Sequence, residues 1–295
     1  MSLLRDNVNG GPRALYEQLK SFVACAGVFN GISAVLAERA GFNALYLSGS
    51  GIAGAMGMPD ISVTTLSEVA EEVRRITSVT RAPLIVDADT GFGEAVNVTR
   101  TVRLLESAGA AGIHIEDQVS PKRCGHLDGK TLVGPEDMAR KIVAAVQARK
   151  NDDFQIIART DARSVNGMED AIERAKIYLD SGADIIFTEA LESREEFARF
   201  AREVKAPLLA NMTEFGKSPL LSVDEIRTLG YKMVIFPLTA FRAALKTIDV
   251  TYRELKLHGT QSGFISNLMD RKEYYDVIGY SDYAKEDQEL SEGDR

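Results

Sequence analysis

The sequence repeats one unit eight times: a short apolar run, a loop, a segment with helical spacing, and a glycine or proline before the next run. The apolar runs are nearly continuous rather than alternating, which is typical of parallel strands with both faces covered. We therefore predict an α/β fold, a (β/α)8 barrel of the TIM type with an N-terminal helix and further C-terminal helices. The predicted strands are 23–29, 44–48, 84–87, 112–115, 155–158, 185–188, 208–211 and 234–238.

An open, doubly wound sheet is the alternative fold for the same repeat. The residues that follow the apolar runs favour the barrel, because nearly every run ends in a polar or ionisable side chain. All eight carboxyl ends of barrel strands open on one face, so these scattered residues become a single site. An open sheet would bring only two or three of them together. The residues concerned are Asn30, Ser48, Asp87, Asp89, Glu116, Asp117, Arg159, Asp161, Glu189, Asn211, Thr213, Glu214, Thr239 and Arg242.

The chain has 295 residues, enough for one large domain, which we expect to occupy residues 1–280. A predicted helix at 240–258 is followed by an amphipathic piece at 264–278 that carries more apolar residues than a solvent-exposed segment needs. We expect this piece to dock on the barrel or on a second subunit. Residues 281–295 contain six acids, two basic residues and almost nothing apolar. They predict a flexible acidic tail.

The net charge is −8, from 43 acidic and 35 basic residues. An acidic protein is poorly suited to general binding of nucleic acids or anionic membranes, and no apolar run reaches the length of a membrane span. Residues 1–11 lack the apolar core of a signal peptide, and two cysteines, Cys25 and Cys124, do not suggest a disulfide framework. We expect a cytoplasmic protein, with Cys25 and His114 buried in the core.

Two aspartates, Asp87 and Asp89, end the third predicted strand and are followed by a glycine-containing turn at 91–93. Carboxylates that point to one place suit a hard cation such as Mg2+, and Glu116 at the end of the next strand could complete the site. The alternative is a pair of aspartates that cap a loop. A divalent ion implies a substrate that chelates through oxygen, such as a 2-hydroxy or 2-oxo acid. Cations available for its carboxylates are Lys122, Arg123, Arg159 and Arg242.

The connection at 119–134 is long for a compact domain, and such connections often serve as functional lids. Its segment 121–126 reads Pro-Lys-Arg-Cys-Gly-His, in which Lys122, Cys124 and His126 can all carry a proton. A thiol among cations could act as a proton donor, a proton acceptor or a nucleophile. The alternative is a loop cysteine without a role, and spacing alone does not establish a pairing of cysteine with histidine.

Five segments closely resemble the signature of the isocitrate lyase and phosphoenolpyruvate mutase superfamily. They are Tyr46-Leu47-Ser48-Gly49, the run 87–93, His114-Ile115-Glu116-Asp117-Gln118, Lys122-Arg123-Cys124-Gly125-His126 and Ala158-Arg159-Thr160-Asp161. The resemblance covers about residues 15–280 in the order of the family. It implies a (β/α)8 barrel, a requirement for Mg2+, and a homotetramer whose subunits exchange the eighth helix.

Within the superfamily the chain is most similar to the methylisocitrate lyase branch. The seventh predicted strand ends Asn-Met-Thr-Glu-Phe-Gly at 211–216, the run 237–242 and the later 259–261 also match that branch, and the large insertion of isocitrate lyases is missing. The implied reaction is Mg2+-dependent cleavage of 2-methylisocitrate to pyruvate and succinate, a step of propionate breakdown in the methylcitrate cycle. Cys124 favours cleavage of a C–C bond, since phosphonate mutases of the superfamily tend to lack it.

The resemblance also implies residue roles. Asp87 and Asp89 would hold Mg2+, with Glu116 in its outer shell, and Cys124 would protonate the carbon released by cleavage. The catalytic set would further include Lys122, His126 and a base, for which Tyr46 and Asp60 are both candidates. The residues expected to bind the substrate, a di- or tricarboxylate, are Ser48, Gly49, Ser50, Arg123, Gly125, Arg159, Glu189, Asn211, Met212, Thr213, Arg242 and Arg271. Ser50 departs from the third glycine that is more usual in this branch.

Three alternatives remain for the function. The nearest is another lyase of the superfamily, such as 2,3-dimethylmalate lyase or oxaloacetate decarboxylase. A C–P mutase or hydrolase is a more distant one. The third is a barrel that has lost catalysis and serves binding or assembly. The complete set of acids, Arg159 and Cys124 argues against it, since an inactive copy would be free to lose some of them.

Overall fold

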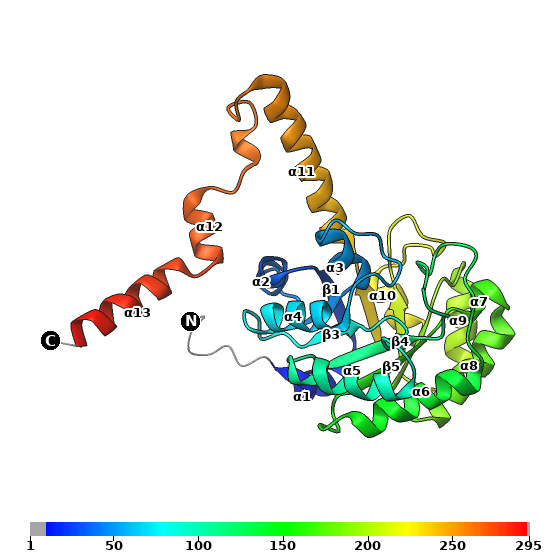
Figure 1. The fold of residues 1–295 in the computed structure, drawn as a ribbon. Helices are drawn as coiled ribbons and strands as arrows, with labels where there is room; N and C mark the ends of the chain where they lie inside the picture. The colour runs from blue at the N-terminus through cyan, green and yellow to red at the C-terminus, as the bar shows by residue number, and fades with distance from the viewer. Residues whose placement is uncertain (1–9, 294–295) are drawn as a thin grey trace.

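The computed structural model describes residues 10–293, and its eight strands form a closed barrel. Every strand runs parallel to its neighbours, and β8 returns to β1 with Cys25 opposite Ile235. The (β/α)8 prediction is therefore confirmed (Figure 1). The strands are β1 Val23–Val28, β2 Ala44–Leu47, β3 Leu84–Asp87, β4 Gly112–Glu116, β5 Gln155–Thr160, β6 Ile185–Thr188, β7 Leu208–Asn211 and β8 Met233–Phe236.

The strand boundaries agree with the predicted ones to within two residues. Differences of two residues occur in β8, which ends at Phe236, two residues before the predicted end, and in β5, which continues to Thr160, two residues beyond the predicted end. The ladder continues because Arg159 pairs with Glu116 of β4 and with Phe187 of β6. The longer strand carries Arg159 as a strand residue with a fixed backbone, rather than as a loop residue.

Helices follow the strands and cover the outside of the barrel. Helix α1 lies at the end of the barrel that is lower in Figure 1. Polar residues after the strands cap several of these helices: Asn30 caps α2 and Thr65 caps α4, each in a reciprocal capping box. The helices are α1 Gly11–Leu19, α2 Gly31–Arg39, α3 Gly49–Ala55, α4 Leu66–Thr77, α5 Ala95–Ser107, α6 Pro135–Ala148, α7 Ala162–Val165, α8 Met168–Asp180, α9 Arg194–Glu203 and α10 Val223–Thr228.

Two apolar layers form the core. One lies between strands and helices, and the other fills the inside of the barrel, where Leu15 of α1 packs against inward-facing residues such as Cys25 and Tyr46. Cys25 is fully buried, as predicted, and burial raises the pKa of its thiol to about 12. The side chains of the inner layer fix the strand ends above them, where the polar residues lie.

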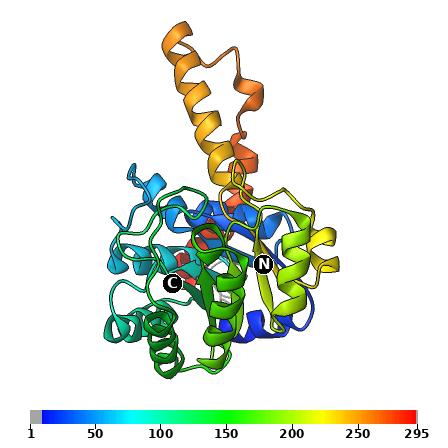
Figure 2. The ribbon, with the colours of Figure 1, turned by 90° about the vertical axis from the view of Figure 1, so that its right-hand side faces the viewer.

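The C-terminal helices form an arm that leaves the barrel. Helix α11, Thr239–His258, begins against the barrel, where Phe241 packs edge-on to Phe29. It then projects outward, and the chain turns back through a 3-10 turn, Ile265–Asn267, into α12, Arg271–Val277 (Figures 1 and 2). The predicted helix at 240–258 is confirmed, but the apolar residues of the piece at 264–278 stay largely exposed instead of packing on this barrel.

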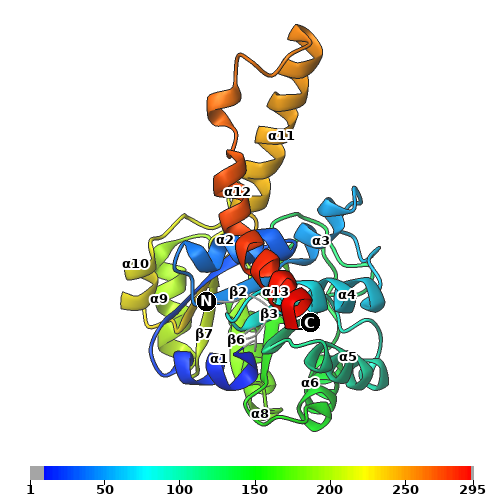
Figure 3. The same cartoon turned by 90° about the vertical axis from the view of Figure 1, so that its left-hand side faces the viewer.

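A further helix, α13, runs from Tyr280 to Gly293, continues the arm after α12 and lies apart from the barrel (Figures 1 and 3). We did not predict this helix, whereas the flexibility expected of the segment 281–295 stays a prediction. The acidic composition suggested disorder, but the same residues favour helix and make pairs one turn apart, Lys285 with Glu289 and Gln288 with Glu292. The domain boundary near residue 280 stays a prediction.

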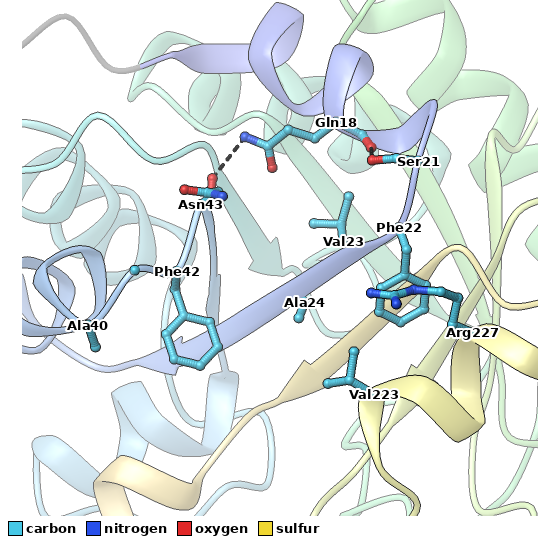
Figure 4. A pocket seen from close by; sticks show the side chains of 11 residues that line it. Gln18, Ser21, Phe22, Val23, Ala24, Ala40, Phe42, Asn43, Val223 and Arg227 are labelled. Atoms are coloured by element: carbon cyan, nitrogen blue, oxygen red, sulfur yellow. Dashed lines mark hydrogen bonds between the residues drawn. The ribbon is translucent and has the colours of Figure 1, made fainter.

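Because α11 leaves the barrel, no helix within residues 10–293 covers the outer face of β1 between α2 and α10. A pocket of about 360 Å³ lies there, lined by apolar side chains such as Phe22, Ala24 and Phe42 and by Arg227 of α10 (Figure 4). Arg227 stacks over the ring of Phe22. In an ordinary (β/α)8 barrel, the eighth helix would occupy this place.

None of the helices in residues 10–293 combines the length and the apolar character that crossing a bilayer requires. The expectation that no signal peptide is present concerns mainly residues 1–9, which lie outside the described part of the chain.

Candidate active site

Five consecutive strands deliver charged or polar side chains to one place at the carboxyl end of the barrel. Arg159 at the end of β5 is central: its guanidinium lies 3.3 Å from Glu116 of β4 and 3.2 Å from Glu189, which follows β6. Asn211, at the end of β7, donates to Glu189 over 3.2 Å. Asp87 ends β3 on the other side of Glu116. The strand ends therefore converge as the sequence predicts.

The acids of this face form a buried cluster suited to a cation. Asp87, His114 and Glu116 each offer a ligand atom, and these atoms lie within 4.8 Å of one another. Asp87 accepts from the backbone N–H groups of Gly49 and Asp89, each over 3.0 Å. The carboxylate of Asp89 also approaches Gly49, so both aspartates face the same space. Asp89 achieves this with a left-handed backbone after the strand has ended, rather than through strand alternation.

Burial and charge act differently on these acids. Burial favours the neutral form of Asp87, but interactions with His114 and Lys122 outweigh it and lower the pKa to about 2. For Asp89, burial dominates over the attraction of Lys122 and raises the pKa to about 6. Burial also raises the pKa of Glu116 well above its usual value, although Arg159 opposes this. The cluster thus holds more carboxylate than its own cations neutralise.

A divalent cation fits these residues. Both carboxylate oxygens of Glu116 are buried and accept no hydrogen bond from the described residues, and the nearest cation, on Arg159, is shared with two other acids. Oxygen donors with spare lone pairs are what Mg2+ requires. His114 belongs to the same group of ligand atoms, although we predicted only a satisfied buried histidine.

His114 links the acid cluster to the inside of the barrel. Its Nε2 lies 2.7 Å from the hydroxyl of Tyr46 and 3.3 Å from Asp87, while its Nδ1 has no hydrogen-bond partner among the described residues. Burial lowers the pKa of His114 to about 4, so the ring is neutral near pH 7. Burial likewise raises the pKa of Tyr46 well above 10. The only sequence signal for this role was the place of His114 two residues before Glu116.

The loop at 119–134, which we call the lid, reaches over the strand ends. Lys122 is buried and forms ion pairs with Asp60 at 2.5 Å and with Asp89 at 3.1 Å. The backbone of Gly125 lies so close to Arg159 and Glu189 that any side chain there would overlap them. The predicted lid residues Lys122 and Gly125 therefore meet the residues of the strand ends.

His126 of the lid faces Glu189, with its Nε2 3.1 Å from the carboxylate. Its Nδ1 accepts from the backbone N–H of Lys217, in the loop after β7, over 3.0 Å. Because Nδ1 is an acceptor, the proton of the neutral ring lies on Nε2, the ring nitrogen that is near Glu189. Burial alone would raise the pKa of Glu189, but Arg159 and His126 together lower it.

Other predicted residues surround this centre or lie away from it. Ser48 is buried beside Gly49, whereas Ser50 is half-buried on α3. Met212 and Thr213 are buried in the loop after β7, where Met212 also belongs to the outer core layer. The residues that the described chain does not bring to the centre are Arg123 and Cys124, exposed on the lid, Arg242, paired with Glu214 on the rim, and Arg271, exposed at the start of α12.

Comparison with known proteins defines the class. Residues 13–256 match the family model described as phosphoenolpyruvate phosphomutase. The chain belongs to the phosphoenolpyruvate mutase and isocitrate lyase superfamily, as the five segments predicted.

Its curated relatives narrow this class. The chain is 60% identical over 279 residues to 2-methylisocitrate lyase of Aeropyrum pernix, covering 95% of this chain and 90% of the relative. It is 47% identical to 2-methylisocitrate lyase of Escherichia coli, covering 88% of each chain. Among solved structures, 2,3-dimethylmalate lyase superposes with a TM-score of 0.90 at 35% identity, covering 96% of each chain.

The acid cluster, in which the Glu116 oxygens accept no hydrogen bond from the described residues, predicts a measurable effect of a divalent cation. Mg2+ that binds only the folded chain stabilises it, by about 2.7 kcal/mol at 100 times the dissociation constant. We expect millimolar Mg2+ to raise the thermal unfolding midpoint of the wild type, and Glu116→Gln to lose most of this shift. Glu196→Gln is the control, because Glu196 pairs with Arg163 away from the cluster. A midpoint that Mg2+ does not move, or a full shift in Glu116→Gln, contradicts the metal site.

Proposed function

We propose that this protein is a 2-methylisocitrate lyase that cleaves 2-methylisocitrate to pyruvate and succinate. The observation that carries the proposal is the similarity to curated 2-methylisocitrate lyases, at 44–60% identity over about nine tenths of the chain. The site supports the proposal, because carboxylates that could hold a cation lie next to Arg159 and next to the lid, which carries Lys122 and Cys124. A substrate with three carboxylates and a hydroxyl group requires such a mixture of groups.

A lyase for 2,3-dimethylmalate is the second candidate, because a solved structure of that enzyme is closely superposable. Its sequence identity of 35% is well below the 60% of the first curated relative. Both substrates are 2-hydroxy acids that break the C2–C3 bond, so the barrel and the acids serve either reaction. What distinguishes them is the additional carboxylate of 2-methylisocitrate.

We propose Mg2+ as the cofactor, held by Asp87 and Asp89 with Glu116 beside them. When bound, the ion would polarise the 2-hydroxyl and the adjacent carboxylate of the substrate as a Lewis acid. Ser48 and Gly49 would hold the end that becomes pyruvate, with Ser50 next to its methyl group. The other substrate carboxylates would meet Arg159 and its neighbours on the strand ends, with Arg123, Glu189, Asn211, Met212, Thr213 and Arg242 around them.

Cleavage begins with loss of the 2-hydroxyl proton. Of the two candidate bases, Tyr46 keeps its proton strongly, because burial raises the pKa of its hydroxyl well above 10. Asp60 is a partly buried carboxylate whose Oδ1 lies 2.5 Å from Nζ of Lys122. We therefore favour Asp60 as the base, and Tyr46 as a hydrogen-bond donor held by His114.

The C2–C3 bond then breaks, and its electron pair moves to C3 and into the attached carboxylate. The resulting aci-carboxylate is stabilised by positive groups, for which Lys122 and Arg159 are placed on the lid and the strand end. His126 holds the lid against Glu189. Cys124 delivers the proton that converts C3 to a methylene of succinate, once the lid has brought its thiol inward.

A substrate panel tests the proposed function. With Mg2+ present, we expect kcat/KM for 2-methylisocitrate to exceed the values for isocitrate, 2,3-dimethylmalate and oxaloacetate by at least tenfold each. Chelation of the metal with EDTA should abolish turnover, and added Mg2+ should restore it. A preference for dimethylmalate or oxaloacetate would assign the chain to a neighbouring lyase, and phosphonate turnover would assign it to the C–P enzymes.

We further propose a homotetramer in which α11 and the helices beyond it pack on a neighbouring subunit. Exposed apolar residues along α11, including Leu245 and Ile248, and the uncovered pocket on β1 support this. Arg271 would then approach a neighbour's site rather than its own. Free cysteines, one of them exposed, support a reducing compartment, and we propose the cytoplasm.

Light scattering after size-exclusion chromatography tests the assembly. The wild type should have four times the mass of one chain. The double variant Leu245→Glu and Ile248→Glu should dissociate, because charges would be buried in the interface. A monomeric wild type, or a variant that assembles normally, contradicts the exchange of helices.

A further inference from the structure

Lys130, like Lys122, is a buried lysine of the lid. Residues of the lid around it, such as Arg123, Cys124 and Leu127, are exposed, whereas the side chain of Lys130 retains only 1% of its accessible surface. Its ammonium group donates to the backbone carbonyl of Gly125 and to Asp161, the latter over 2.9 Å. A buried ammonium is costly unless it is paired, so these two contacts determine where this part of the lid can lie.

The partner of Lys130 also orients Arg159. Asp161 accepts from the Nε of Arg159 over 2.9 Å and from its Nη2 over 3.2 Å. One fully buried carboxylate therefore holds the arginine of the strand end and the lysine of the lid at the same time. Gly125, the other partner of Lys130, lies directly against Arg159.

Asp161 is itself held in place by a second buried carboxylate, that of Asp117. Its backbone N–H donates to Asp117 over 2.9 Å, and Asp117 also accepts from Tyr178 over 2.8 Å and from Arg174 of α8 over 3.3 Å. These residues are buried behind β4 and β5. The position of Asp161 is therefore fixed. Its ion pair with Lys130 fixes the position of the lid segment that carries this lysine.

We propose that Lys130 is a positioning residue that fastens the lid to the carboxylate of Asp161 and so couples lid closure to the orientation of Arg159. It touches neither the acid cluster nor the proposed proton donor, and acts through Gly125 and Asp161. The inference rests on the proposed function for its catalytic consequence. The lid attachment itself does not depend on the identity of the substrate.

Lys130→Met tests this, because it keeps most of the aliphatic stem and removes the ammonium group. We expect kcat for 2-methylisocitrate to fall by about 100-fold, as for a loss of precise positioning. Affinity for Mg2+ should stay within threefold, since Lys130 does not contact the acid cluster. Hydrogen exchange without any ligand should become at least tenfold faster in peptides from 119–134, with the strands unchanged. Should Lys130→Met not fold, Lys130→Gln, which retains a donor for Gly125, is measured in the same way.

Lys217→Met is the matched control. Lys217 also forms an ion pair with the lid, to Asp128 at 2.6 Å, but Asp128 is largely exposed to solvent. Exposed ion pairs contribute about 1 kcal/mol or less, so kcat and lid exchange should both change less than about fivefold.

The proposal would be overturned if Lys130→Met had both a kcat and a hydrogen-exchange rate of the lid peptides close to the wild-type values. Faster exchange throughout the barrel would also overturn it, because Lys130 would then be a residue of general stability. A wild type that does not cleave 2-methylisocitrate contradicts the proposed function alone, since the exchange measurement needs no substrate.

Discussion

The site depends on the way Arg159 is surrounded by acids at the ends of the strands. Its guanidinium lies within 3.3 Å of carboxylates from Glu116, Asp161 and Glu189. Arg159 is nearly buried, and such a cation is tolerated only with close and well-oriented partners. Three acids share this one arginine, and burial raises the pKa of Glu116 well above its usual value although Arg159 opposes the shift. Further positive charge would stabilise these buried carboxylates. Lys122 of the lid supplies part of it, and a divalent cation would supply more.

The barrel supplies side chains in fixed positions, and the lid supplies side chains whose burial depends on where the lid lies. The strands hold the acids, Arg159 and His114 over a fully packed interior, so their positions are fixed before any ligand binds. The lid supplies cations that are buried only when it lies over the strand ends. Lys122, Lys130 and His126 each contact a different acid of the barrel. Closing the lid therefore matches several charges at once, and in the present lid conformation Cys124 is still exposed.

The repeat of apolar runs was sufficient to predict the barrel, because the carboxyl ends of parallel strands must share one face. The same rule predicted that Asp87, Glu116 and Arg159 would meet. It could not predict the partners of Lys130, since they depend on the path of the lid in three dimensions. We did not predict helix α13, because acidic residues are common both in disordered segments and on the exposed faces of helices. Arg242 was predicted from its place after the eighth strand and from resemblance, and Arg271 from resemblance alone. Within one described chain neither reaches the centre.

The measurement that most directly tests the central claim is product analysis in D2O. Wild-type protein with Mg2+ and 2-methylisocitrate should yield pyruvate and succinate in equal amounts. The succinate should carry one deuterium, because the acid that protonates C3 has exchanged with solvent. Cys124→Ser should form these products at least about 100-fold more slowly while still binding Mg2+, since the loss of a general acid costs on the order of 10²–10⁴ in rate. An absence of C–C cleavage in the wild type, or near-normal turnover in Cys124→Ser, would contradict the account.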